Sequence, residues 1–178
     1  MVICLILEFS NFFAPNFANA SEKSVTIKID GIVKRTFTWD ELESKKGSDT
    51  WVGPRIYSTI NTYPTKKWYT AEGVKLRALL EDAGIDLNSQ NICQMNVKAA
   101  DSYQMTFTKR ELLDDIRYYF PGLKDNHEYY GHVIGSTDGK EPVDAIIALK
   151  SADSDNFSHM TSQGCPLLIF GQRWITEQ

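Results

Sequence analysis

Two apolar alternations joined by a tight-turn pair constrain the fold of this chain most strongly. Val25, Ile27 and Ile29 alternate with polar residues, which is the period-2 pattern of a strand with one buried face. Asp30-Gly31 follows, a pair that favours the two-residue turn of a β-hairpin, and Val33–Phe37 returns as a second strand. We therefore expect an antiparallel hairpin early in the folded domain.

Two capping boxes indicate where short helices begin. Thr38 is followed three residues later by Glu41, and Thr108 by Glu111. At this spacing each side chain satisfies a backbone N–H of the other residue. We expect the first of these helices to end near Lys45.

Apolar residues at helical spacing define a further helix. Leu76, Leu79, Leu80 and Ala83 stand at i, i+3, i+4 and i+7, which places them on one face, and Gly84 is typical of the position that ends a helix.

The helix after the second capping box is expected to be longer than the first. Leu112, Ile116 and Tyr119 have the spacing of one helix face, and Pro121-Gly122 ends the pattern.

Strand patterns and helix patterns are mixed along the chain without a regular strand–helix–strand alternation. This predicts an α+β fold with an antiparallel or mixed sheet. Loops are expected at 45–54 and 61–67. The further strands are expected at 55–60, 92–99, 103–107, 130–134, 143–149 and 166–170.

The composition excludes several classes of protein. The 178 residues suit one compact domain, and a hydrophobic content of 42% is too high for a disordered chain. A net charge of −4, from 19 basic and 23 acidic side chains, argues against nucleic-acid binding. No apolar run reaches about 18 residues, so no membrane span is expected. The 3 cysteines are too few for a disulfide-built scaffold.

Residues 1–20 differ from the rest of the chain because Glu8 is their one charged residue. Ala18-Asn19-Ala20 has the small-x-small form of a signal-peptidase site, which predicts cleavage before Ser21. The interpretation is a signal peptide at 1–20, a domain at 21–178 and an extracytoplasmic location: secreted, periplasmic or on the cell surface. The alternative is an N-terminal strand or helix packed on the domain.

Two cysteines remain if the leader is removed. Cys93 lies in an apolar-alternating run, which favours a buried and inert thiol, and Cys165 precedes a predicted strand. Outside the cytoplasm the two thiols could form one disulfide.

The stretch Arg55–Trp68 concentrates hydrogen-bonding side chains, lysines and large aromatics after a predicted strand. Such a segment could line a pocket for an anionic ligand, with cations neutralising a phosphate and hydroxyl or amide groups fixing its orientation. An exposed polar loop with aromatic anchors is the alternative. The candidate binding residues are Arg55, Ser58, Thr59, Asn61, Lys66 and Lys67.

Histidine spacing does not favour a metal site. His127 and His132 stand at i and i+5, whereas two zinc ligands on one helix face need i and i+4, and His159 stands alone. A metal-dependent hydrolase that uses these three residues is therefore the weakest hypothesis.

Several motifs follow one another in a characteristic order. The most specific is Gly73-Val74 followed by the pattern Leu-x-x-Leu-Leu-x-x-Ala-Gly that ends at Gly84. The full set is Asp30-Gly31, Trp39–Leu42, Trp68–Ile85, Ala100–Tyr103, Glu111–Leu113 and Gly164–Ile169. This order resembles the molybdopterin-binding domain of the sulfite oxidase family over nearly all of residues 24–178. The resemblance implies a single domain of that type with a mixed sheet and short helices, a molybdopterin cofactor and oxidoreductase activity.

The chain departs from that family at the metal. The family binds molybdenum through a cysteine thiolate in the loop before the Gly-Val helix, but residues 58–62 here contain no cysteine, and Asn61 stands near its place. In the first hypothesis, an exported molybdopterin-type oxidoreductase, Arg55, Lys66 and Lys67 would contact the cofactor phosphate and Asn61 would face the metal. In the alternative, a non-catalytic extracytoplasmic module recognises a small anion, glycan or protein through Arg55–Trp68. Neither hypothesis assigns catalytic residues.

Overall fold

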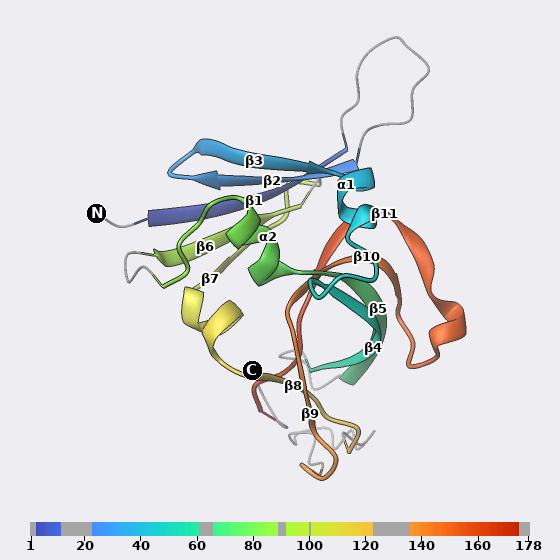
Figure 1. Ribbon diagram of the computed structural model, residues 1–178. Helices are drawn as coiled ribbons and strands as arrows, with labels where there is room; N and C mark the ends of the chain where they lie inside the picture. Colours follow the sequence, from blue (N-terminus) through green and yellow to red (C-terminus); the bar gives the residue numbers. More distant parts are fainter. Residues whose placement is uncertain are drawn as a thin grey trace.

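The computed structural model describes residues 3–11, 23–60, 66–88, 92–99, 101–122 and 136–174, and it is built mostly from β-strands (Figure 1). The expected α+β class is wrong, and with it the sulfite-oxidase-like arrangement of sheet and helices. Strands in three sheets make up most of the described structure, and the helices are few and short. The helical segments in the described ranges are short: α1 (Trp39–Ser44), α2 (Leu76–Asp82), the π-helical η1 (Arg110–Asp114) and the 3₁₀-helical η2 (Phe157–His159).

The first sheet, which we call sheet A, has five strands in the order β3-β2-β1-β6-β7. β1 and β6 run parallel and the other neighbours run antiparallel. The expected hairpin is present as β2 and β3. The strands span β1 (Ile3–Asn11), β2 (Lys23–Ile29), β3 (Ile32–Thr38), β6 (Ile92–Lys98) and β7 (Gln104–Phe107).

The second sheet, sheet B, has four antiparallel strands in the order β11-β10-β5-β4, and β8 pairs with β9 in a small third sheet. In Figure 1, sheet B lies to the right of α2 and below α1. These strands span β4 (Trp51–Ile60), β5 (Lys66–Lys75), β8 (Arg117–Tyr119), β9 (Glu141–Val143), β10 (Ile146–Ala152) and β11 (Thr161–Ile169).

One hydrophobic core joins the two large sheets through α2. Because strand side chains alternate between faces, sheet B also buries a smaller apolar cluster on its other face, around Tyr57 and Ala71. The main core draws its largest members from both sheets and from α2: Leu7, Val25, Ile27, Phe37, Met95, Val74, Ile147, Leu149, Leu76, Leu79 and Leu80.

The two capping boxes are confirmed. The Thr38 hydroxyl accepts from the Glu41 N–H at 3.2 Å while the Glu41 carboxylate accepts from the Thr38 N–H at 2.8 Å. Thr108 and Glu111 make the same pair of bonds at 3.1 and 2.8 Å. The expected apolar face of α2 is also confirmed, and Gly84 follows the helix with a φ of +75°. Among the residues that the structure describes, no helix is long and apolar enough to cross a membrane.

The helix that follows the second capping box, η1, is shorter than expected. η1 ends at Asp114, Asp115 is extended, and Ile116 is 63% exposed, so it does not share a buried face with Leu112. The chain turns into β8 because Tyr118 pairs there with Gln172, and this long-range strand pairing overrides the local helical pattern. The strand expected at 130–134 lies outside the described residues.

β1 occupies a central position in sheet A, between β2 and β6. Its Leu7 side chain is fully buried. This arrangement agrees with the alternative to a signal peptide, in which an N-terminal strand packs on the domain. Cleavage before Ser21 stays a prediction, and it would remove the strand that connects the β2–β3 hairpin to β6.

A chain that begins at Ser21 should therefore be less stable than the full chain. Loss of the buried Leu7 alone should lower the free energy of unfolding by about 2 kcal/mol. Urea unfolding of the two chains tests this, with Leu7→Ala in the full chain as the matched variant. Equal midpoints for all three would show that β1 contributes nothing to the folded domain and would favour the leader interpretation.

Gly73 of β5 lies directly against the backbone of β10. A Cβ atom at this position would lie 2.1 Å from the backbone oxygen of Ile147, so the two strands could not keep their spacing. Gly73→Ala should lower the free energy of unfolding by about 3 kcal/mol because rigid backbone must move. Gly53→Ala in β4 is the control, since a Cβ there meets nothing within 4 Å. Equal effects of the two substitutions in thermal unfolding would contradict this account of the sheet.

Candidate functional site

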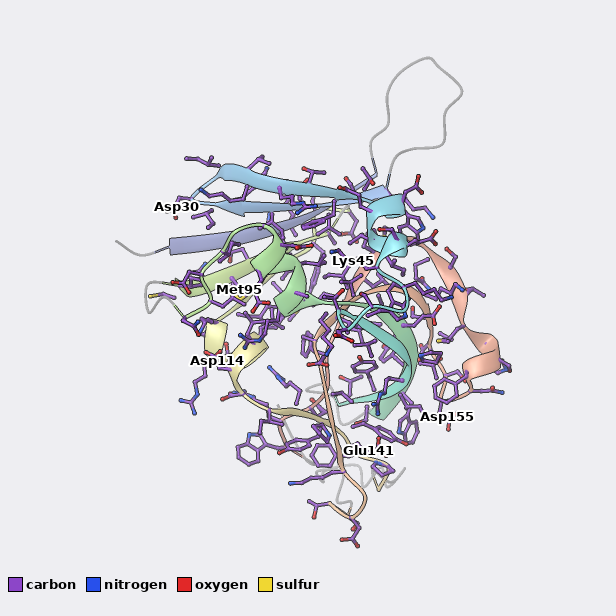
Figure 2. All side chains as sticks on the ribbon, viewed as in Figure 1. Asp30, Lys45, Met95, Asp114, Glu141 and Asp155 are labelled. Atoms are coloured by element: carbon purple, nitrogen blue, oxygen red, sulfur yellow. The ribbon has the colours of Figure 1, made fainter. Side chains whose placement is uncertain are left out.

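A cavity of about 640 Å³ opens on sheet B. Strands β4, β5, β10 and β11 all contribute to its wall. Figure 2 shows Asp155 close to this region, beside the β10–β11 connection, and far from Asp30 at the β2–β3 turn. The lining residues are Tyr57, Thr59, Tyr69, Ser151, Ala152, Asp153, Thr161, Gln163 and Leu167–Phe170.

Strand register places the polar lining residues on one face of sheet B. Tyr57 is opposite Tyr69 across β4 and β5, and Ser151 is opposite Thr161 across β10 and β11. Residues directly opposite each other in an antiparallel pair lie on the same face. The cavity wall is therefore rich in hydroxyl groups, with aromatic rings at one side and the apolar Leu167–Phe170 segment at another.

Tyr57 is a fixed and neutral part of this wall. Its side chain is 1% exposed, and its hydroxyl donates to the backbone oxygen of Asp144 at 3.2 Å. Burial, and secondarily the Asp144 carboxylate, raise the pKa of the phenol well above its ordinary value of 10.0. Tyr57 therefore closes this wall from the protein side, and its hydroxyl stays protonated and bound to the backbone.

Three of the predicted binding residues have clear positions. Thr59 lines the cavity, as expected for a ligand contact. Ser58 is fully buried, and its Oγ accepts from the Phe120 N–H at 3.0 Å, so it connects β4 to the segment after β8. The Arg55 guanidinium is exposed and lies 3.3 Å from the Glu141 carboxylate, outside the cavity wall.

The side chains of the other three predicted binding residues, Asn61, Lys66 and Lys67, lie outside the described part of the structure. Lys66 and Lys67 begin β5, where Lys67 is the register partner of Thr59, and their side chains lie outside the described part of the structure. Asn61 also lies outside the described residues. The expected loop at 61–67 therefore gives way to a strand at its last two residues, because β5 pairs with β4 from Lys66 onward.

Neither Cys93 nor Cys165 lines this cavity. Cys93 is exposed, so the expectation of a buried thiol is wrong, and both Cys93 and Cys165 are free, so the disulfide that the sequence left open is not formed between them. Cys165 instead lines a separate apolar cavity of about 180 Å³ between β7 and β11. No group of three or more metal-ligating side chains occurs in the described ranges.

The described histidine has a local contact. The His159 Nδ1 atom lies 3.1 Å from the Ser154 hydroxyl, within the connection between β10 and β11. His127 and His132 lie outside the described residues, so no distance between the three histidines supports the hydrolase hypothesis.

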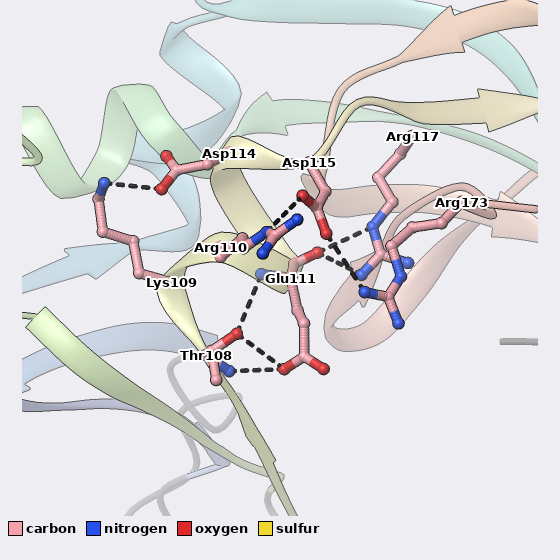
Figure 3. A network of polar contacts seen from close by, with 8 residues as sticks. All are labelled: Thr108, Lys109, Arg110, Glu111, Asp114, Asp115, Arg117 and Arg173. Carbon is pink, nitrogen blue, oxygen red and sulfur yellow. Dashed lines mark hydrogen bonds and ion pairs between the residues drawn. The ribbon is translucent and has the colours of Figure 1, made fainter.

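A second polar cluster lies around η1 and the end of β11, and Figure 3 shows it from close by. The Arg117 guanidinium, only 8% exposed, donates through Nε to the Glu111 backbone oxygen at 2.9 Å and through Nη1 to the Gly171 oxygen at 3.3 Å. Asp115 pairs with Arg110 at 3.1 Å and with Arg173 at 3.2 Å. The cluster joins η1 to the last described segment, so its role is structural.

The electrostatics of this cluster agree with that role. Hydrogen bonds from the Thr108 N–H and hydroxyl lower the pKa of the Glu111 carboxyl. The hydrogen bond from Arg110 lowers the pKa of Asp115, and burial lowers the pKa of Arg117. The carboxylates are thus held in their charged forms by groups within the protein itself.

Glu111→Gln should reduce stability in a pH-dependent way. Because the folded pKa of Glu111 is below its ordinary value of 4.5, its stabilising contribution is present above pH 4.5 and is lost as the pH falls through the lowered value. The difference in unfolding midpoint between wild type and variant should therefore shrink below pH 4.5. Glu43→Gln on α1 is the control with the same loss of charge. A difference that stays constant from pH 7 to pH 3 would contradict the assignment.

Several lining residues lack a local sequence signal. Tyr69, Ser151, Thr161 and Gln163 reach the cavity because β5 and β11 both pair with β10. Residues 161–169 show no alternation of polar and apolar side chains that could have indicated a second cavity wall. The partners on β5 and β10 are roughly 80 residues apart in sequence, so local periodicity cannot identify that pairing.

Comparison of the chain with protein-family models, with curated proteins and with solved structures finds no match.

Proposed function

We propose that this protein is a small-molecule-binding domain, and that the cavity on sheet B holds an organic ligand without thiolate-bound molybdenum. The observation that carries the proposal is the chemistry of the cavity wall. The described lining offers hydroxyls, one amide, one carboxylate and two tyrosine rings, and it contains no thiol. An extracytoplasmic location belongs to the same proposal and rests on the Ala18–Ala20 motif.

The dimensions of the cavity support ligand binding. A volume of about 640 Å³ falls within the range of roughly 300–1,000 Å³ that small-molecule sites occupy. The combination of apolar wall, aromatic ring and a few polar groups is also typical of such sites. Tyr69 offers a ring for a planar heterocycle, and Ser151, Thr161 and Gln163 offer polar atoms for its edge.

The fit to a molybdopterin cofactor is partial. A pterin ring suits the tyrosines and the polar groups of the wall. The metal does not fit in the same way, because molybdenum in this type of site takes a soft sulfur donor and the nearest described thiol, Cys165, faces another cavity. Arg55, the expected phosphate contact, is neutralised by Glu141. We therefore assign no redox step to the cavity.

A molybdopterin-dependent oxidoreductase is the second candidate. One observation favours it: Tyr57 and Thr59, next to the stretch that the resemblance assigns to the cofactor, line the cavity. In that case the dithiolene of the cofactor would hold the metal without a protein thiolate.

Titration with pterin, followed by NMR, tests whether the cavity binds. Thr161 lies exposed at the cavity wall, so Thr161→Trp should fill the entrance and weaken pterin binding by tenfold or more. Ser162→Trp is the matched control, because the next strand residue points to the opposite face and is not a lining residue. Inorganic phosphate, the probe for a small anion, should cause no shift at the lining residues.

The contradicting results are specific. Equal pterin affinities of Thr161→Trp and Ser162→Trp would place the binding site elsewhere. Failure of pterin to shift any lining residue of the wild-type protein, with phosphate shifting them instead, would replace a heterocycle by a small anion as the ligand.

A further inference from the structure

A second cavity, of about 180 Å³, lies between sheet A and β11. Strands β6 and β7 form one side of it, and the end of β11 forms the other. None of its described lining residues carries a carboxylate, an ammonium, a guanidinium or an imidazole group. The polar side-chain groups of this described wall are the Tyr103 hydroxyl and the Cys165 thiol. The wall offers nothing that balances a charge, so it suits a neutral ligand.

A wide bulge of β11 forms one side of the cavity. Between the pairs that β10 makes at Ala148 and Lys150, one residue of β10 stands opposite the four residues 163–166 of β11. Cys165 belongs to these four residues and lines the cavity. The Lys23 ammonium on β2 donates to a backbone oxygen of the bulge at 2.8 Å, which fixes the bulge to sheet A. Bulges redirect a strand locally and are frequent next to binding sites.

An aromatic pair forms a rigid part of the wall. The Phe107 and Phe170 rings pack edge to face, with centroids 5.4 Å apart and planes at 84°. The Arg117 guanidinium lies 5.0 Å from the centre of the Phe170 ring, and Arg117 is itself held by hydrogen bonds to backbone oxygens. Phe170 is therefore held in place by two partners, and its ring is positioned before a ligand enters.

The rim of the cavity consists of large apolar side chains in contact with water. Tyr103 is 62% exposed and Met105 is 42% exposed. Both lie on the face of β7 that lines the cavity, because alternate strand residues share a face. A ligand that covers them removes apolar surface from water, which favours binding.

The size and the chemistry of the wall define the class of ligand. An apolar cavity of about 150 Å³ is sufficient to bind benzene, so about 180 Å³ accommodates one ring with a small substituent. Three aromatic rings, from Tyr103, Phe107 and Phe170, line the space together with the sulfur atoms of Met105 and Cys165. Edge-to-face contacts between rings and contacts between sulfur and a ring both favour an aromatic ligand over a saturated one.

We propose that this cavity is a second ligand site, and that it takes a neutral ligand with a single aromatic ring. The site goes beyond the proposed function, because its ligand uses neither the hydroxyls nor the amide of the cavity on sheet B. Leu167, Leu168 and Phe170 line both cavities, so the two sites are neighbours.

The Cys165 thiol provides a measure of occupancy. Iodoacetamide alkylates a thiolate with release of iodide, and mass spectrometry measures the rate at each cysteine separately. Saturating benzyl alcohol should slow the alkylation of Cys165 at least fivefold, because the probe covers the cavity wall. The rate at Cys93, which is exposed and lies outside the cavity, should stay unchanged. Cyclohexylmethanol, with a saturated ring, and benzoate, with a charge, should need at least fivefold higher concentrations for the same protection.

Matched variants place the protection in this cavity. Ala99 lines the cavity, so the added ring of Ala99→Phe should fill it, slow the alkylation of Cys165 without a probe and abolish the effect of benzyl alcohol. Gln104→Phe adds the same ring on the opposite face of β7 and should behave as wild type. Ala99→Leu, a smaller change, should weaken the protection by benzyl alcohol if Ala99→Phe does not fold.

Three results would overturn the proposal. An unchanged rate at Cys165 in saturating benzyl alcohol, or equal slowing at Cys165 and Cys93, would show that the cavity holds no such ligand. Equal protection by cyclohexylmethanol would exclude the aromatic class. Equal behaviour of the Ala99 variants and Gln104→Phe would show that the protection arises elsewhere.

Discussion

The close pairing of β5 with β10 at Gly73 is the constraint on which the rest of the structure depends. The absent side chain lets the two backbones approach, since a Cβ would meet the Ile147 oxygen at 2.1 Å. Because strand faces alternate, this pairing directs Val74 and Ile147 into the main core and Ala71 and Ala148 to the opposite face. Strands β4 and β11 then pair on the two outer sides, and the cavity is formed between their side chains.

The polar groups of the protein divide into two functions. The charged cluster around Arg117 and Asp115 is satisfied by backbone oxygens and ion pairs, so it stabilises the contact between η1 and the segment after β11 (Figure 3). The cavity wall is different, because it is mostly uncharged and its polar groups are held by strands. A ligand site made from Tyr69, Thr161 and Gln163 favours shape and hydrogen-bond matching over neutralisation of charge.

Local patterns in the sequence predict local structure well. The hairpin of β2 and β3, the two capping boxes and the apolar face of α2 all depend on residues within a few positions of each other. The α+β class was wrong because β5 and the start of β4 are strands only through long-range pairing. Of the predicted site, Thr59 lines the cavity, whereas Tyr69 could not be identified because β5 reaches the cavity through its pairing with β10, about 80 residues away.

The central claim is that the cavity on sheet B binds an organic ligand without thiolate-held molybdenum. The most direct measurement is the molybdenum content of the full chain, purified folded from a host that makes the molybdenum cofactor and expressed as molybdenum atoms per chain. The absence of a cysteine from the described cavity wall predicts a value far below one. One molybdenum atom per chain would contradict the account and would establish the oxidoreductase as the function of this site.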